Sequence, residues 1–193
     1  MEGGLAQFWD GSDAIGRAVA LLLFAMSVAS WIAILWKGFT LRRAARDGER
    51  ALAAFWAAPT LHEGRERLAA LDREALLAPL VDAAQQSVTG ASLAAEAAPA
   101  AQLTRQLRDA LHAALRRLQS GQVLLASVGA TAPFVGLFGS VWGMYHALAA
   151  LASGSGLTIE RIAAPVGEAL VMTAAGLVVA VPAVIAYNLY SRW

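Results

Sequence analysis

Apolar residues gather into three long runs along this chain, and the polar residues between the runs mark where each one ends. The run at 18–36 has 19 residues without Asp, Glu, Lys or Arg, the run at 118–159 has 42, and the run at 169–191 has 23. A helix needs about 20 apolar residues to cross a bilayer. The runs therefore predict three transmembrane helices, and the polar break SGSG at 153–156 predicts that the last two form an antiparallel hairpin.

These breaks divide the chain into six segments. Residues 1–17 combine acidic residues with Leu5, Phe8 and Trp9, which predicts an outward-facing segment at the membrane interface, with a frayed terminus as the alternative. The other predicted segments are a transmembrane helix over 18–36, a cytoplasmic helical region over 37–117, a transmembrane helix over 118–152 with a cytoplasmic extension from about residue 100, an outward-facing connector over 153–161 and a transmembrane helix over 162–191. The predicted fold class is an all-α membrane protein with long helices extending into the cytoplasm.

Basic residues set the orientation. Between Lys37 and Arg117 lie 12 of the 15 basic residues, against nine acids, so the positive-inside rule places this region in the cytoplasm. The basic residues alternate with acids and crowd the membrane junctions, which favours a topological role over nucleic-acid binding. A cleaved signal peptide is the competing interpretation of 18–36, but the acidic segment before it and the basic residues after it favour a retained helix.

A leucine stripe predicts how the cytoplasmic region joins the second span. Its leucines recur at spacings of four and three: Leu103, Leu107, Leu111, Leu115 and Leu118. This is the period of one face of a helix. We therefore expect one uninterrupted helix from about Ala100 to Ala152.

Composition excludes several classes of function. With 58% apolar and 15% charged residues, the chain is too hydrophobic for an ordinary soluble domain. It has no cysteine, three scattered histidines and no pairing of a nucleophile with a base. We expect no enzymatic activity, no metal site and no cofactor.

Small residues line one face of each span in the hairpin. The positions expected to let the helices approach closely are Gly136, Gly139, Gly143 and Gly176, while Pro133 and Pro182 bend or start helices. Helix packing is the simpler explanation for such stripes. The alternative is that part of each stripe borders a narrow pore, and the residues alone leave this open.

Two hydroxyls in the hairpin are predicted to lie at one depth. Ser140 and Thr173 are 12 and 11 residues from the outer ends of their spans, which places both about 17 to 18 Å deep at 1.5 Å per residue. This is near the middle of a core about 30 Å thick. A lone serine or threonine usually bonds to its own helix, but two at one depth could pass a proton or hold a carboxylate from a partner.

Glu168 is the one acid inside an apolar span, about 9 Å below its outer end. Such a residue is costly to place in a membrane and indicates function. His146 lies at the same expected depth, so a contact between imidazole and carboxylate is one hypothesis; a carboxylate satisfied by water or helix amides is the other. Together with Thr131, His146 is a candidate for a supporting role behind the proton path.

The hairpin also carries a family resemblance. The stretches ASVGATAPFVGLFGSVWGMYHAL (126–148) and APVGEALVMTAAGLVVAVPAVIAYN (164–188) resemble the ExbB/TolQ family of bacterial inner-membrane motor proteins, related more distantly to MotA. The wording APFVGLFG and the N-terminal layout are closer to the ExbB members, whereas YHAL and AYN leave TolQ open. Ser140 stands where the family typically has threonine, and the chain ends at Trp193 where relatives continue into a basic helix.

The resemblance implies a multi-pass protein of the bacterial inner membrane with a periplasmic N-terminus. It implies a homopentameric ring around the membrane helices of an ExbD-like single-span partner (or TolR), which brings a proton-carrying aspartate. Proton flow would drive a TonB-like protein (or TolA) that works on the outer membrane. Carried onto this sequence, the residues that form the proton pathway and face the partner are Ser140, Thr173 and Glu168. A TolQ-type subunit and a passive membrane scaffold are the alternatives, and lipid is the expected surrounding.

Overall fold

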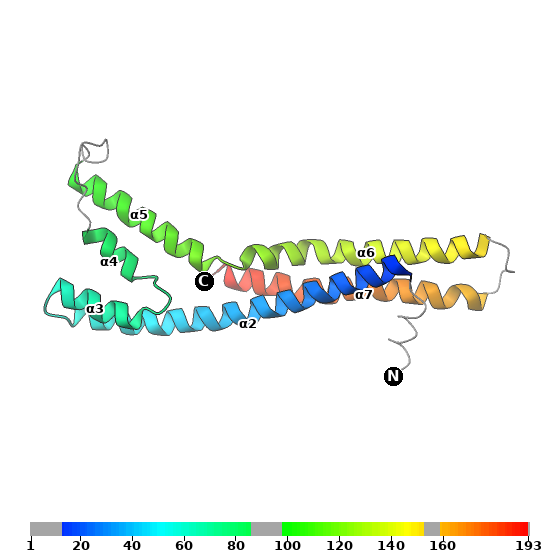
Figure 1. Cartoon of the computed structure of the whole chain (residues 1–193), viewed down its shortest axis with the longest axis horizontal. Coiled ribbons are helices and arrows are strands. Elements are labelled where there is room, and N and C mark those ends of the chain that lie inside the picture. Colours follow the sequence, from blue (N-terminus) through cyan, green and yellow to red (C-terminus); the bar gives the residue numbers. More distant parts are fainter. Residues whose placement is uncertain (1–12, 86–97, 153–158, 193) are drawn as a thin grey trace. The chain divides into compact units, whose positions relative to one another are not determined.

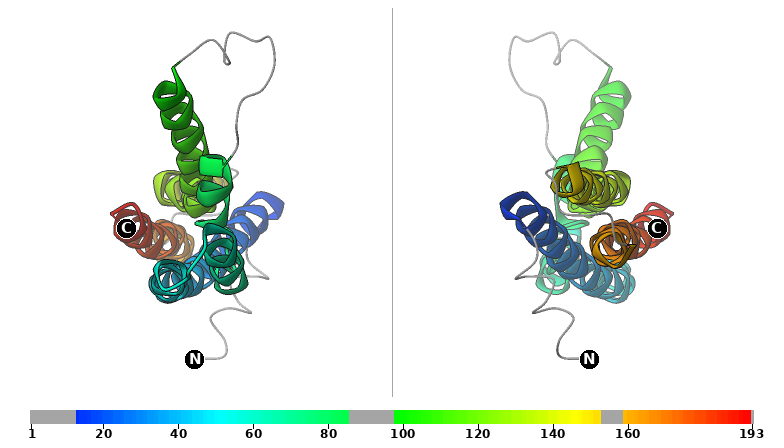
Figure 2. Two further views of the ribbon diagram at one scale, coloured as in Figure 1. Left: turned by 90° about the vertical axis from the view of Figure 1, so that its left-hand side faces the viewer. Right: turned by 90° about the vertical axis from the view of Figure 1, so that its right-hand side faces the viewer.

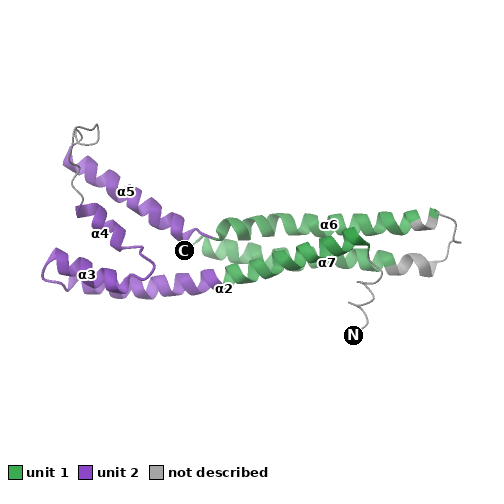
Figure 3. Cartoon of the chain, in the orientation of Figure 1, with its two compact units in different colours: residues 1–35, 121–193 green, residues 36–120 purple. Residues whose placement is uncertain are grey.

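The computed structural model describes residues 13–85, 98–152 and 159–192, all of whose regular structure is helical. The helices are α2 (Ala14–Trp56), α3 (Leu61–Leu71), α4 (Ala78–Gln85), α5 (Pro99–Leu118), α6 (Gln122–Ala152) and α7 (Ile159–Tyr190) (Figure 1). They divide into two compact units (Figure 3): unit 1 combines 1–35 with 121–193, and unit 2 is 36–120. The residues predicted to lie at the interface, Leu5, Phe8 and Trp9, and the SGSG break fall outside the described residues.

Among the described residues, three helices are long and apolar enough to cross a membrane: Ala14–Trp56, Gln122–Ala149 and Pro165–Tyr190. The predicted fold class, an all-α membrane protein with three transmembrane helices, is therefore confirmed. The first of these helices runs well past the predicted span at 18–36, because no proline interrupts the chain until Pro59. At its start, the Asp13 carboxylate accepts the backbone N–H of Gly16 at 2.7 Å and acts as a helix cap.

In unit 1, α6 and α7 lie side by side along most of their length, as Figures 1 and 2 both show. Large apolar side chains on their outer faces are exposed, whereas the buried residues are mainly alanines with a few larger side chains such as Leu125 and Met172. The buried cluster of this unit contains Val19 and Leu23 of α2, with Leu125, Val128, Ala132, Met172, Val179, Ala180 and Ala183 of the hairpin. The hairpin is thus a close pairing of two helices, with the start of α2 packed against it.

The expected uninterrupted helix from about Ala100 to Ala152 is wrong. The structure has two helices here, because α5 ends at Leu118 and α6 begins at Gln122. Gly121 has a φ of 80°, a left-handed conformation that glycine adopts without strain and that ends a helix. The leucine period continues up to this break, so periodicity alone conceals the stop that Ser120 and Gly121 encode.

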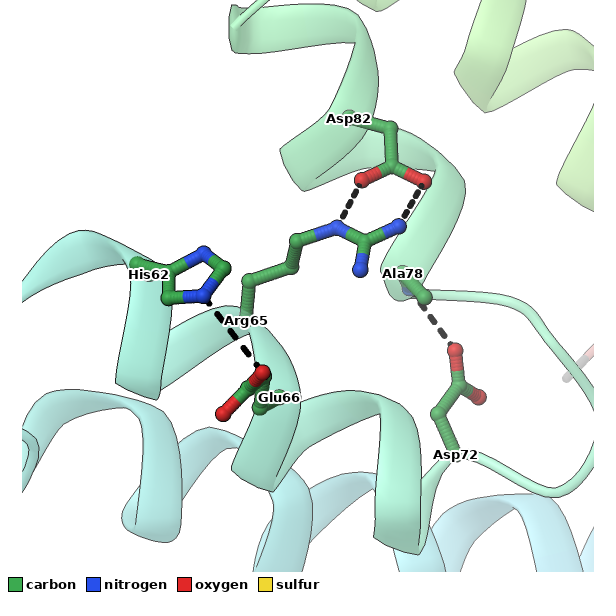
Figure 4. A network of polar contacts seen from close by, with 6 residues as sticks. All are labelled: His62, Arg65, Glu66, Asp72, Ala78 and Asp82. Carbon is green, nitrogen blue, oxygen red and sulfur yellow. Dashed lines mark hydrogen bonds and ion pairs between the residues drawn. The ribbon is translucent and has the colours of Figure 1, made fainter.

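In unit 2, short helices are held by polar contacts (Figure 4). The Asp72 carboxylate accepts three backbone N–H groups at the start of α4, from Leu76, Leu77 and Ala78, at 2.7 to 3.0 Å. Arg65 of α3 donates to both carboxylate oxygens of Asp82 of α4, at 2.5 and 3.1 Å. This pairing lowers the pKa of Asp82 and raises that of Arg65. Unit 2 therefore gains its geometry largely from charges and helix caps.

A buried lysine also links two elements of unit 2. The Lys37 side chain is only 3% exposed, and its ammonium donates to the carbonyl oxygen of Ser120 at 2.8 Å. This carbonyl follows the end of α5, where a cation is favoured by the helix dipole. The contact joins the middle of α2 to the turn after α5.

Candidate functional site

The site begins with two hydroxyls on facing helices. The Ser140 hydroxyl of α6 and the Thr173 hydroxyl of α7 lie 2.5 Å apart, so the two residues are at one level of the hairpin, as helix rise predicts. Ser140 is 5% exposed and also donates to the backbone carbonyl of Ala169, one turn before Thr173. Thr173 is half-buried.

The hydrogen-bond partners fix the direction of the bond between these hydroxyls. A carbonyl oxygen only accepts, so the single proton of Ser140 is engaged by Ala169. The bond between the hydroxyls must then be donated by Thr173 and accepted by Ser140. In this arrangement Thr173 has no further proton to donate, but its oxygen keeps a lone pair for another donor.

Small residues on both sides of the pair let the helices come this close. A Cβ on Gly136 would lie 2.6 Å from the carbonyl oxygen of Met172 and 3.0 Å from the Cα of Gly176. On the other side, a Cβ on Gly143 would lie 3.2 Å from that of Ala169. The serine side chain is short, so Ser140 can form a hydrogen bond to the backbone of α7 only where the two helix backbones lie very close together.

The other predicted packing positions have separate neighbours. A Cβ on Gly139 would lie 2.9 Å from a methyl of Val19 in α2 and 3.3 Å from Met172 in α7. Both prolines, Pro133 and Pro182, lie inside their helices. The predicted glycine positions thus border other helices of the same chain.

The hypothesis of a contact between Glu168 and His146 finds no support in the geometry. Glu168 is half-buried on α7, and no hydrogen bond or ion pair joins it to His146. The His146 ring instead has its Nδ1 3.9 Å from a carboxylate oxygen of Asp13. Thr131, the other supporting candidate, donates to the carbonyl of Ser127 in its own helix at 2.7 Å.

Sequence reasoning missed a polar contact between α6 and the start of α2. The Trp142 indole N–H donates to Asp13 at 2.6 Å, and the Trp142 ring stacks on Phe138 with centroids 6.4 Å apart. This hydrogen bond, together with the cap to Gly16, lowers the pKa of Asp13 against the opposing effect of burial. The pairing could not be predicted from the sequence, because it depends on how α2 is rotated relative to α6.

Two further contacts close the opposite end of unit 1. The Tyr190 hydroxyl of α7 donates to the carbonyl of Ile34 in α2 at 2.8 Å. The Gln122 side chain at the start of α6 donates to the carbonyl of Tyr190 at 3.1 Å. All three helices of the unit are thus joined near this end, through groups that no periodicity singles out.

Residues 72–193, which include the whole hairpin and its hydroxyl pair, match the MotA/TolQ/ExbB proton channel family. The chain belongs to this family. It is 39% identical to the biopolymer transport protein ExbB of Xanthomonas campestris pv. campestris (strain B100), over 94% of this chain and 75% of that protein. It is 38% identical to ExbB of Neisseria meningitidis serogroup A, over 95% of this chain and 86% of that protein. The Tol-Pal system protein TolQ of Pseudomonas aeruginosa is 33% identical, over 91% of this chain and 78% of its own length.

The resemblance inferred from the hairpin sequences is therefore confirmed, and the chain is a membrane-embedded, multi-pass member of the MotA/TolQ/ExbB family. Within the described ranges, no group of three or more His, Cys, Asp or Glu side chains could hold a metal ion. Within the spans Gln122–Ala149 and Pro165–Tyr190 the sequence has a single acid, Glu168, on the same helix as Thr173.

Proposed function

We propose that the chain is an ExbB-type proton-channel subunit that works with an ExbD-like partner. In this proposal it forms a homopentamer in the bacterial inner membrane, with its N-terminus in the periplasm. It would couple the proton motive force, through a TonB-like protein, to energised uptake across the outer membrane. The ExbB proteins of Xanthomonas and Neisseria are more similar to this chain than the TolQ relative is, which supports this assignment. The proposal requires no cofactor, nucleic acid or enzymatic step.

The observation that carries the proposal is the hydroxyl pair inside an apolar hairpin. Ser140 uses its proton on Ala169, and Thr173 uses its proton on Ser140, so the pair presents an acceptor to any third group. A protonated carboxylic acid on a partner helix could donate to Thr173. A charged carboxylate needs a donor instead, which Thr173 could supply only by releasing Ser140. The pair would thus respond differently to the two protonation states of a partner's aspartate.

Glu168 extends this path toward one membrane surface. It lies five residues before Thr173 on α7, which corresponds to about 7.5 Å of helix rise. With the proposed topology, a proton from the periplasm would reach the level of Glu168 before that of the hydroxyls. A carboxyl group can take up and release a proton, and acids inside membrane spans typically mark proton relays. Ser140 would then act by positioning Thr173.

Replacing the hydroxyls tests the proposal. We expect Thr173→Val to abolish partner-dependent uptake, because valine keeps the shape but neither donates nor accepts. Ser140→Ala should weaken uptake and Ser140→Thr should preserve it. Thr104→Val, which removes a hydroxyl bonded to its own helix outside the hairpin, is the matched control and should have little effect. Expression and oligomer mass should remain near those of the wild type in every case.

Full uptake in a variant carrying both Ser140→Ala and Thr173→Val would exclude the hydroxyl path and favour a passive scaffold. Copurification with candidate single-span partners that carry an intramembrane aspartate separates the ExbB and TolQ assignments. We expect stable capture of an ExbD-like partner, and the native mass of the complex gives the stoichiometry. Preferential capture of a TolR-like partner would assign the chain to the Tol-Pal system instead.

A further inference from the structure

Unit 2 contains a basic cavity that the proton-channel proposal does not use. It measures about 390 Å³ and is lined by residues from two separate segments: Phe39, Arg42, Arg43, Arg46, Asp47 and Arg50 of α2, and Arg73 from the turn after α3. Five arginines thus line one cavity against a single aspartate. Arg73 is not on α2, so the convergence is a result of folding and not only of a charged stretch of helix.

Most of this positive charge is not neutralised within the described part of the chain. Arg43 lies 3.7 Å from Asp47. The remaining four arginines make no ion pair with any described acid: Arg42, Arg46, Arg50 and Arg73. Arginine presents several donors in a planar fork that matches a phosphate. Like charges held around one cavity therefore favour an anion between them.

The position of the cavity along α2 indicates where that anion comes from. The apolar run ends at Trp36, and Phe39, which lines the cavity, is 67% exposed. Arg42 follows Trp36 by six residues, or about 9 Å of helix rise, while the interfacial layer is about 5 to 8 Å thick on each side. A long arginine side chain can extend back along the helix toward that layer. In that position the Phe39 ring would face acyl chains while the guanidinium groups reach a phosphate.

We propose that this cavity binds the phosphate of an anionic phospholipid from the membrane leaflet where the first span ends. Arg42, Arg43 and Arg46 contact the headgroup, and Arg73 closes the cavity from the far side. Zwitterionic lipids carry the same phosphate with a choline or ethanolamine cation, which these arginines repel. The inference is independent of proton transport, because a motor and a scaffold would both hold such a lipid.

Native mass spectrometry of the delipidated full-length protein in detergent tests this assignment. The probes are dioleoyl phosphatidylglycerol and dioleoyl phosphatidylcholine, each titrated at low salt. We expect the wild type to prefer phosphatidylglycerol, and the R42Q/R46Q variant to bind it on the order of tenfold more weakly, since each basic residue near an anionic membrane surface contributes measurably. R105Q/R108Q on α5 removes the same charge outside the cavity and should keep the preference.

Wild-type binding of phosphatidylglycerol should also fall as ionic strength rises, which tests the site without any substitution. R73Q, from the other segment, should weaken binding as well. Unchanged lipid preference in R42Q/R46Q would overturn the proposal, as would an equal loss in the α5 control, which would indicate net charge alone. Displacement of phosphatidylglycerol by millimolar inorganic phosphate would instead assign the cavity to a soluble anion.

Discussion

The α6–α7 hairpin of unit 1 and the α3–α5 helices of unit 2 are both helical, yet different contacts hold them. In the hairpin, backbone meets backbone: a Cβ on Gly176 would lie 2.6 Å from the carbonyl oxygen of Ala132. In unit 2, few apolar side chains are buried, Leu68 and Ala114 among them, and the contacts that fix the helices are ion pairs and caps.

The difference follows from the solvent around each part. Lipid is as apolar as a side chain, so burying apolar area contributes little free energy to the association of membrane helices. Close packing of small residues must supply that free energy instead. In water, short helices gain from burial but also need their free backbone groups capped. The hairpin should therefore be sensitive to added volume, and unit 2 to charge, pH and salt.

Gly136→Val should produce the largest effect, because its side chain would meet the backbone of α7, which cannot move aside cheaply. We expect a loss of about 3 kcal/mol or more in stability, with weaker association of α6 and α7. Thermal unfolding in detergent, monitored by circular dichroism, measures it. Gly167→Ala is the matched control, since a Cβ there meets nothing within 4 Å. A destabilisation by the control as large as that by Gly136→Val would show that steric fit does not hold the hairpin.

Trp142→Phe should have a smaller effect and tests the polar contact within unit 1. Phenylalanine keeps an aromatic ring beside Phe138 but loses the N–H that Asp13 accepts. We expect a loss of about 1 kcal/mol at neutral pH. Because the folded pKa of Asp13 is lowered, this contribution is present above the ordinary aspartate pKa of about 4 and is lost as pH falls through the folded value. Wild type and variant should therefore converge in acid, and a constant difference at all pH values would contradict this explanation.

Asp72→Ala should loosen the start of α4 in unit 2. Three backbone N–H groups lose their acceptor, and helix caps of this kind contribute about 1 kcal/mol. Amide hydrogen exchange should show faster exchange at residues 76–78, with the α6–α7 hairpin unaffected. Asp109→Ala, on α5, removes an acid without removing a cap and should leave that exchange unchanged. Equal protection in wild type and Asp72→Ala would mean that the cap does not hold α4.

Asp82→Asn should have the smallest effect, because the ion pair with Arg65 is largely exposed. The lowered pKa of Asp82 means that the pair stabilises unit 2 above the ordinary aspartate pKa and that this contribution disappears as pH falls through the folded value. Raising the salt concentration should shrink the difference between wild type and variant. A stability difference between wild type and variant that does not change with salt would mean that hydrogen bonding, and not charge, accounts for the contribution of Asp82.

The three spans and the common level of Ser140 and Thr173 could be predicted, because both depend on quantities that a sequence contains: run length and helix rise. The direction of the bond between the hydroxyls could not, since it depends on the carbonyl of Ala169. The glycine at position 121 could have indicated a helix end, but the regular leucine spacing before it led us to expect a continuous helix. The contact between Asp13 and Trp142 depends on the rotation of one helix relative to another, which neither length nor period determines.

The chain crosses between the two units twice, and the crossings differ mechanically. At residues 35 and 36 it crosses within α2, where successive turns are hydrogen-bonded and resist torsion. At residues 120 and 121 the helical ladder is interrupted by the left-handed Gly121, whose own dihedrals can absorb twist. We therefore expect a torsion of the first span to pass along α2 more readily than a torsion of α6 passes along the backbone into α5. The first crossing is a continuous helix, and the second is a glycine turn that can rotate.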